Sequence, residues 1–220
     1  LVFNKWPERT TQKNFGIQKA RWEYLCFIDS DMELATEIIS ECTRKIQSSE
    51  IIWWICIPEN SVWEWFFVKV RDFERSFYGW SSVESARFFR KKNIVEVWGF
   101  EEDLIFFEES LLPQKIESFL WLECKARINS LINHHEWDIK LWKWLKKKYY
   151  YGQSLNKYKA KVSKIGIKET WDWQMWILSR YMIFLKHPKF YKKPLLAVSV
   201  LSLKTLEFGS GAMGLLFSKK

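Results

Sequence analysis

Short apolar runs alternate with helically spaced segments along the first 130 residues, and this alternation is what most limits the folds open to the chain. Residues 24–28 and 51–57 are compact apolar runs of the length typical of buried strands. Residues 33–47 carry apolar side chains at Leu34, Ile38, Ile39, Cys42 and Ile46, which is helical spacing.

The remaining segments of this part predict the other elements of the same fold class. Residues 85–97 predict two short strands around a turn at Lys92 and Asn93. Helices are predicted in 8–24, with Thr10 or Thr11 as the N-cap, in 66–78, and in 112–129, with Pro113 in the first turn. Strands that alternate with helices predict an α/β fold with a mixed-direction sheet flanked by helices.

The C-terminal part has a different character, so we expect a boundary near residue 138, with one domain in 1–138 and a helical region in 139–220. Residues 140–164 contain nine Lys and no acid, so the rest of the chain accounts for none of the net charge of +9. This basic, aromatic stretch could meet anionic lipid headgroups, nucleic acid or an acidic acceptor, or it could be a solvated helix face.

An apolar segment, residues 194–217, follows this basic stretch. Its longest uncharged apolar run, 195–203, is shorter than the roughly 20 residues that span a bilayer. Lys204 and Glu207 near its middle also disfavour a spanning helix. We therefore expect a helix that lies on a membrane or docks on the domain.

Two aspartates end the first apolar run, in the sequence YLCFIDSD. Alternate side chains of an extended chain point the same way, so Asp29 and Asp31 would face one ligand together. Open α/β sheets bind ligands at the carboxyl ends of their strands. Two carboxylates there are compatible with a shared Mg²⁺ or Mn²⁺ and a diphosphate, although a single D-x-D triplet is more often a solvated turn.

The context of this triplet resembles the family-2 glycosyltransferases, which have the GT-A fold. RTTQKNFGIQKARWEYLCFIDSD resembles the family stretch R-N-x-G-I-x-x-A-x-G-E-Y-(apolar)-D-x-D, EVWGFEEDLIFFEES resembles G-G-F-(D/E)-E-x-L with its acidic pair, and INHHEW resembles I-x-H-x-E. The resemblance covers roughly residues 5–160. The family's N-terminal strands, which carry much of the nucleotide-base pocket, have no counterpart here, so we expect a fragment that lacks its N-terminus.

The resemblance implies an inverting, metal-dependent transfer of a sugar from a nucleotide-sugar donor to a saccharide or lipid-linked acceptor. The expected GT-A fold is a Rossmann-like nucleotide-diphospho-sugar transferase sheet, the expected cofactor is Mg²⁺ or Mn²⁺, and no nucleic-acid partner is expected. The expected location is cytoplasmic, peripheral on the inner face of the plasma membrane. Alternatives are a nucleotidyltransferase of related fold and a non-catalytic module that binds an anionic membrane surface.

The same resemblance assigns roles to individual residues. Asp31 would be a metal ligand, and Asp29 would contact the metal or the nucleotide ribose. Glu109 or Glu108 would be the general base that deprotonates the acceptor, although the family more often has Asp at the second position. The remaining candidates are the metal ligands His134 and His135, the phosphate contacts Arg9 and Lys13, the donor-site residue Asn14, and an acceptor side that includes Arg71, Asp72, Glu74 and Arg75.

The chain has 15 Trp and only 8 Gly, and several tryptophans occupy glycine positions of these motifs. Trp22 stands at the Gly of A-x-G-E-Y, and Trp98 stands at the first Gly of G-G-F. We hypothesise that the source reads UGA as glycine, while this sequence was translated with UGA as tryptophan. The alternative is real tryptophans that stack on sugars or anchor a membrane. The proposed glycine positions are Trp6, Trp22, Trp53, Trp54, Trp63, Trp65, Trp80, Trp98, Trp121, Trp137 and Trp142, whereas Trp144 and Trp173 look like ordinary tryptophans.

The cysteines indicate reduced thiols. Cys26, Cys42, Cys56 and Cys124 are scattered and form no C-x-x-C pair, which argues against a zinc ribbon. Such usage is typical of a cytosolic protein.

Overall fold

The computed structural model describes residues 9–81, 84–104, 108–120, 124–136, 140–165 and 177–218. Trp6, Trp121, Trp137 and Trp173 lie outside these ranges. The strands are β1 (Tyr24–Cys26), β2 (Met32–Leu34), β3 (Trp54–Cys56), β4 (Glu59–Ser61), β5 (Ala86–Arg90), β6 (Lys125–Arg127) and β7 (Ile132–His134). The helices are α1 (Arg9–Lys19), α2 (Ile38–Gln47), α3 (Phe66–Arg75), α4 (Lys91–Glu96), α5 (Glu108–Leu120), α6 (Leu141–Gln153), α7 (Leu155–Ile165), α9 (Ile177–Leu185), α10 (Pro188–Tyr191) and α11 (Pro194–Leu216).

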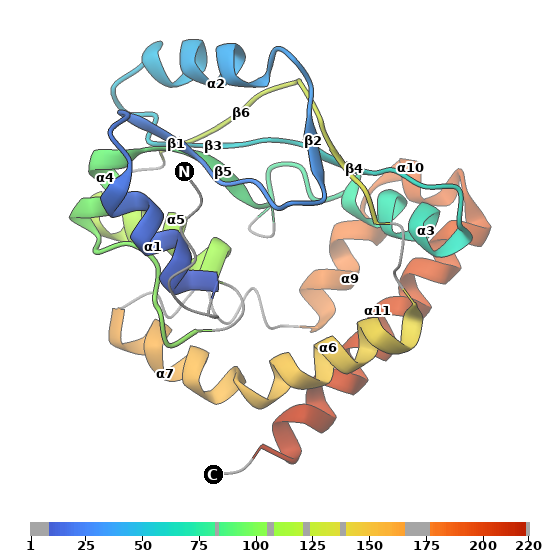
Figure 1. Ribbon diagram of the computed structural model, residues 1–220. Helices are drawn as coiled ribbons and strands as arrows, with labels where there is room; N and C mark the ends of the chain where they lie inside the picture. The colour runs from blue at the N-terminus through green and yellow to red at the C-terminus, as the bar shows by residue number, and fades with distance from the viewer. Residues whose placement is uncertain are drawn as a thin grey trace.

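The strands form two sheets of mixed direction, flanked by helices (Figure 1). In the four-stranded sheet, with order β1-β5-β3-β6, β5 is antiparallel to β1 and β3, whereas β3 and β6 are parallel. In the three-stranded sheet, with order β2-β7-β4, β2 and β7 are antiparallel and β4 and β7 are parallel. The predicted α/β fold with a mixed-direction sheet flanked by helices is therefore confirmed.

Helices cover both faces of the four-stranded sheet, because β3, one of its two inner strands, is apolar on both sides. Ile55 of β3 packs in a cluster with the α2 residues Ile38, Cys42 and Ile46. Trp54 and Cys56, which point the other way, pack with residues of α1, α4 and α5. A strand covered on both faces reads as a continuous apolar run, which is what residues 51–57 show.

The structure corrects several details of the sequence prediction. The second half of 85–97 is helix α4 rather than a strand, since Ile94 and Val97, three residues apart, both turn into the core. The predicted helix 112–129 begins at Glu108 and ends at Leu120, so Pro113 lies inside it and residues 125–127 form β6. Helix α1 contains both Thr10 and Thr11, so neither is its N-cap.

The C-terminal helices dock on α3 through an aromatic cluster. Phe73 and Phe77 pack with Phe184 of α9, Phe190 of α10 and Val200 of α11. Helix α11 is, among the described residues, the one helix long and apolar enough to cross a membrane by length and composition. The charges near its middle are nevertheless buried within the protein.

These buried charges pair α11 with α3. Lys204 contacts the carboxylates of both Glu74 in α3 and Glu207 in α11. Trp144 of α6 donates its indole N–H to Glu207, and the Arg71 guanidinium lies 4.4 Å from the centre of a Trp144 ring. Trp144, expected to be an ordinary tryptophan, thus has specific partners.

Two described non-glycine residues have φ in the left-handed region, and both are tryptophans. Trp80 has a φ of 63° and Trp98 a φ of 67°. Glycine adopts this conformation without the steric cost that a Cβ brings. These two positions therefore favour the glycine hypothesis, whereas Trp54 is buried and fills the core.

Candidate functional site

The pairing of β2 with β7 brings two of the sequence motifs together. The strands are antiparallel, with Met32 opposite His134, and the backbone N–H of His135 donates to the carbonyl oxygen of Asp31. Asp31 Oδ2 then lies 3.2 Å from His134 Nε2. His135 turns to a different partner, with its Nε2 3.1 Å from Glu33.

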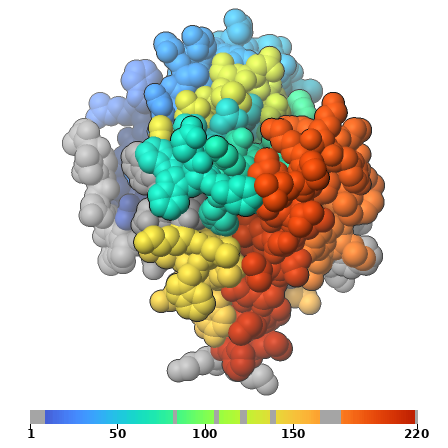
Figure 2. Space-filling model, turned by 90° about the vertical axis from the view of Figure 1, so that its right-hand side faces the viewer, coloured from blue at the N-terminus to red at the C-terminus, as the bar shows by residue number. Residues whose placement is uncertain are grey.

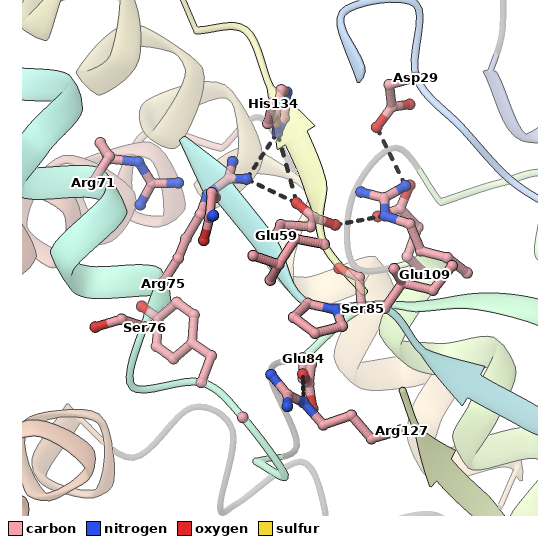
Figure 3. A pocket seen from close by; sticks show the side chains of 17 residues that line it. Asp29, Glu59, Arg71, Arg75, Ser76, Glu84, Ser85, Glu109, Arg127 and His134 are labelled. Carbon is pink, nitrogen blue, oxygen red and sulfur yellow. Dashed lines mark hydrogen bonds and ion pairs between the residues drawn. The ribbon is translucent and has the colours of Figure 1, made fainter. Parts of the chain in front are cut away.

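A polar cavity of about 370 Å³ lies beside this strand pair (Figure 3). Three residues from three separate motifs line it, namely Asp29, Glu109 and His134. The other charged residues in its wall are Glu59, Arg71, Arg75, Glu84, Arg87 and Arg127. Of the predicted acceptor-side residues, Arg71 and Arg75 thus line the same cavity as Asp29 and His134, which are predicted to lie on the donor side.

Glu59 is the centre of an ion-pair network in this cavity. Its two carboxylate oxygens accept from Arg87, at 2.5 Å, and Arg75, at 2.8 Å. Burial raises the pKa of the Glu59 carboxyl, but the hydrogen bond from His134 and the charges of Arg87 and Arg75 outweigh it and lower the pKa to about 2. Glu59 is therefore ionised at neutral pH.

Arg75 and Arg87 carry this network to the predicted site residues. Arg87 lies 3.5 Å from Asp29. Arg75 Nη1 lies 2.8 Å from His134 Nδ1.

The acidic pair at the start of α5 divides into a buried and a cavity-facing member. Glu108 pairs with Arg9, and its side chain is 1% exposed. The Glu109 side chain is 23% exposed, lines the cavity and pairs with Lys13 Nζ at 2.8 Å. Of the two candidate bases, Glu109 is the one with access to a ligand. Arg9 and Lys13, the predicted phosphate contacts, instead neutralise these two carboxylates.

The surroundings of Glu109 keep it ionised. Burial raises the pKa of its carboxyl, but Lys13 and Arg87 outweigh this effect and hold the pKa below its ordinary value. An ionised carboxylate can accept a proton, although a lowered pKa makes it a weaker base.

The side chain of Asn14 holds the loop that precedes α5 through two hydrogen bonds to the backbone of Phe100. Its Nδ2 donates to the Phe100 carbonyl at 2.8 Å, and its Oδ1 accepts from the Phe100 N–H at 2.8 Å. A Cβ at Gly99 would lie 2.5 Å from Asn14 Oδ1, so this close approach requires glycine. The side chain of Asn14 is thus engaged in the loop rather than directed to a ligand.

Asp31 and His134 together form a donor set that suits Mg²⁺ or Mn²⁺. Their 3.2 Å separation is close to the roughly 3 Å between neighbouring ligands of an octahedral ion with bonds of about 2.1 Å. Glu59 Oε2, 3.6 Å from His134 Nδ1, is an acceptor that would orient a ligating imidazole. No group of three or more His, Cys, Asp or Glu able to hold a metal occurs among the described residues. A Mg²⁺ site commonly uses one or two carboxylates together with substrate phosphates, and Asp31 supplies one such carboxylate.

Sequence reasoning missed Glu59, Glu84, Arg87 and Arg127 of the cavity wall. Glu59 follows the buried strand β3 and Pro58, so the argument used for the carboxyl end of residues 24–28 would have found it. Arg87 and Arg127 lie within strands, and their shared cavity depends on the sheet order.

The chain matches no known protein family and no curated protein.

Proposed function

We propose that the chain is an inverting, metal-dependent glycosyltransferase of the GT-A fold. The observation that carries the proposal is the convergence of three separate motifs, with Asp29, Glu109 and His134 in one cavity and Asp31 within 3.2 Å of His134. Asp31 and His134, far apart in the sequence, come together through the pairing of β2 with β7. The proposed reaction moves a sugar from a nucleotide-sugar donor to a polysaccharide or lipid-linked acceptor.

In this reaction the acceptor hydroxyl oxygen attacks the anomeric carbon of the donor sugar. The new C–O bond forms as the bond from the anomeric carbon to the diphosphate oxygen breaks, and the nucleoside diphosphate leaves with the electron pair. Glu109, which is ionised, takes the hydroxyl proton. Attack from the face opposite the leaving group inverts the anomeric centre.

Asp31 and His134 would hold the metal, and Asp29 would contact the metal or the ribose. A bound Mg²⁺ or Mn²⁺ would neutralise charge on the departing diphosphate. Glu59, as the acceptor beside His134 Nδ1, would orient the imidazole.

The basic and apolar C-terminal helices support a location at the cytoplasmic face of the plasma membrane. Residues 177–206 contain no Asp or Glu, and their exposed side chains include Leu178, Met182, Leu195 and Val198. A surface that is both basic and apolar suits an anionic bilayer.

The test is turnover of nucleotide-sugar donors with Mn²⁺. Asp31→Ala should abolish both donor hydrolysis and transfer. Glu109→Gln should reduce transfer by about 10²–10⁴-fold, the contribution of a general base, while Glu96→Gln on the exposed face of α4 should leave it unchanged. Activity that survives Asp31→Ala would refute the metal assignment. Turnover of nucleoside triphosphates instead would favour the nucleotidyltransferase, and vesicle binding without any turnover would favour the non-catalytic module.

A further inference from the structure

A second hollow, of about 750 Å³, adjoins the cavity on the side of the C-terminal helices. Asn60 and Ser76 line both the cavity and this hollow, so the two share part of their wall. The hollow lies between the β4–α3 segment on one side and α10 with the start of α11 on the other. Figure 2 shows these two segments side by side on one face of the molecule.

Two lysines of this hollow have no carboxylate partner among the residues that the structure describes. Lys189 and Lys193 lie over the rings of Phe77 and Phe73, at 5.6 and 5.8 Å from the ring centres. The third lysine of the wall, Lys69, pairs with Glu64. The wall also contains Asp72, which accepts from the backbone N–H of Ser61. Its three lysines and two carboxylates leave a net charge of +1, and the two lysines without a carboxylate partner lie at α10 and the start of α11.

The cavity itself offers no such surplus. Its wall holds four arginines and four carboxylates, and each arginine pairs with a carboxylate. The donor diphosphate would meet the charge of the metal at Asp31 and His134. The remaining, balanced set of donors and acceptors suits an uncharged, hydroxyl-rich group better than a second anion. An acceptor that spans both spaces would have a saccharide end and an anionic segment.

The hollow is also apolar, and the apolar surface continues beyond it. Val62, Phe73 and Leu196 contribute to its wall. Tyr191, Leu195 and Val198 are exposed on α10 and α11. Trp63 and Trp65 add to the wall, but the charge and the aliphatic residues remain if those two positions are glycine.

We propose that this hollow binds a lipid-linked saccharide acceptor through its phosphate and its hydrocarbon chain. The phosphate lies at Lys189 and Lys193, the chain runs over Leu196 toward Leu195 and Val198, and the saccharide end points through Asn60 and Ser76 toward Glu109. This assignment rests on the proposed glycosyltransferase function and selects the lipid-linked acceptor over a free polysaccharide.

The test uses dodecyl phosphate as the probe, below its micellar concentration, with binding measured by calorimetry on the whole chain. Dodecyl phosphate should bind at least tenfold more tightly than dodecyl maltoside, which has the same chain and no charge. Lys189→Glu with Lys193→Glu should weaken binding of dodecyl phosphate at least tenfold. Lys157→Glu with Lys159→Glu, two exposed lysines of α7, makes the same charge change and should leave binding unaltered.

Three further measurements complete the design. Leu196→Ser should weaken dodecyl phosphate but not inorganic phosphate. Equal affinity for inorganic phosphate would overturn the lipid site in favour of a free-anion site, and equal effects of the α7 and α10–α11 variants would overturn the assignment to Lys189 and Lys193. Binding that needs anionic vesicles and is not seen with dodecyl phosphate would show a membrane contact and overturn the single-lipid site.

Donor hydrolysis separates this inference from the proposed function. The Lys189→Glu, Lys193→Glu variant should keep Mn²⁺-dependent hydrolysis of the donor while losing transfer to a lipid-linked saccharide. Lysine-dependent binding of dodecyl phosphate without any donor turnover would overturn the glycosyltransferase proposal, and with it the acceptor role, and leave a lipid site. Donor turnover without lysine-dependent binding would overturn the lipid site alone.

Discussion

Replacement of Trp98 by glycine should stabilise the protein, although it removes the largest side chain. Trp98 has a φ of 67°, and its side chain is 90% exposed. A left-handed backbone costs a residue with a Cβ about 1–2 kcal/mol, and the exposed indole regains little of this by burial. Glycine avoids that cost but gives the unfolded chain extra freedom worth about 0.5–1 kcal/mol. We expect Trp98→Gly to raise the free energy of unfolding by about 0.5–1 kcal/mol, or the melting temperature by about 1–4 °C.

Urea and thermal unfolding of four variants would check this reasoning. Trp80→Gly, with a φ of 63°, should behave like Trp98→Gly. Trp22 is also largely exposed, at 79%, but has no positive φ, so Trp22→Gly should destabilise by about 0.5–1 kcal/mol. Trp54 is 5% exposed in the core, and Trp54→Gly should cost at least about 3–5 kcal/mol. A Trp98→Gly variant that is destabilised as much as Trp22→Gly would refute the argument from backbone conformation.

The coding sequence gives an independent check of the translation hypothesis. UGA codons are expected at Trp80 and Trp98, where the backbone favours glycine. A UGG codon is expected at Trp144, whose indole N–H donates to Glu207. UGG at Trp80 and Trp98 would mean that these residues are real and that the chain tolerates the strain.

Three further predictions concern stability. Gly214→Ala should lower the free energy of urea unfolding by about 1–3 kcal/mol, because a Cβ there would lie 2.0 Å from a carbonyl oxygen of α6. Gly209 has open space around it, so Gly209→Ala should be neutral or stabilising in the same assay. Lys204→Met should cost about 3–5 kcal/mol because it strips the buried carboxylates of α3 and α11 of a partner, while Lys186→Met at an exposed site should change the unfolding free energy by less than about 0.5 kcal/mol. The pKa of Glu59 falls from 4.5 to about 2 on folding, so Glu59 contributes roughly 3 kcal/mol to stability above pH 4.5, and this contribution is lost as the pH falls toward 2. Glu59→Gln should therefore flatten this part of the acid-unfolding profile. An unchanged profile would contradict the pairing of Glu59 with Arg75 and Arg87.

The elements that the sequence predicts well are those whose own periodicity decides their structure. Helix α2 buries Ile38, Cys42 and Ile46, each four residues apart, and the continuous apolar run of β3 is covered on both faces. The missed strands β2, β4, β6 and β7 have three residues each, too few for an alternating pattern to show. Helix α4 was missed because its β-branched residues favour a strand locally, whereas packing against the sheet decides for a helix.

The candidate site residues divide in the same way, into those that local sequence motifs predict and those that depend on the fold. Asp29, Asp31 and Glu109 belong to local motifs that the sequence alone shows as candidates. The choice between Glu108 and Glu109 depends on burial, which only the fold supplies. Arg87 becomes a candidate only through the sheet order, since β5 lies between β1 and β3. No pattern within residues 85–97 predicts that the side chain of Arg87 lines the cavity.

The two adjacent histidines show how the register of one strand pair selects a functional residue. Leu34 and Ile132 lie opposite each other in β2 and β7, and both pack into the cluster beneath α2. A shift of one residue would take this apolar pair out of the core and turn every side chain of the strand to the other face, so burial fixes the register. In the register that burial selects, His134 faces Asp31 and the Glu59 network, whereas His135 faces Glu33. His134 is therefore the proposed metal ligand of the two histidines. The packing of Ile132, two residues earlier, fixes the strand register that places His134 beside Asp31.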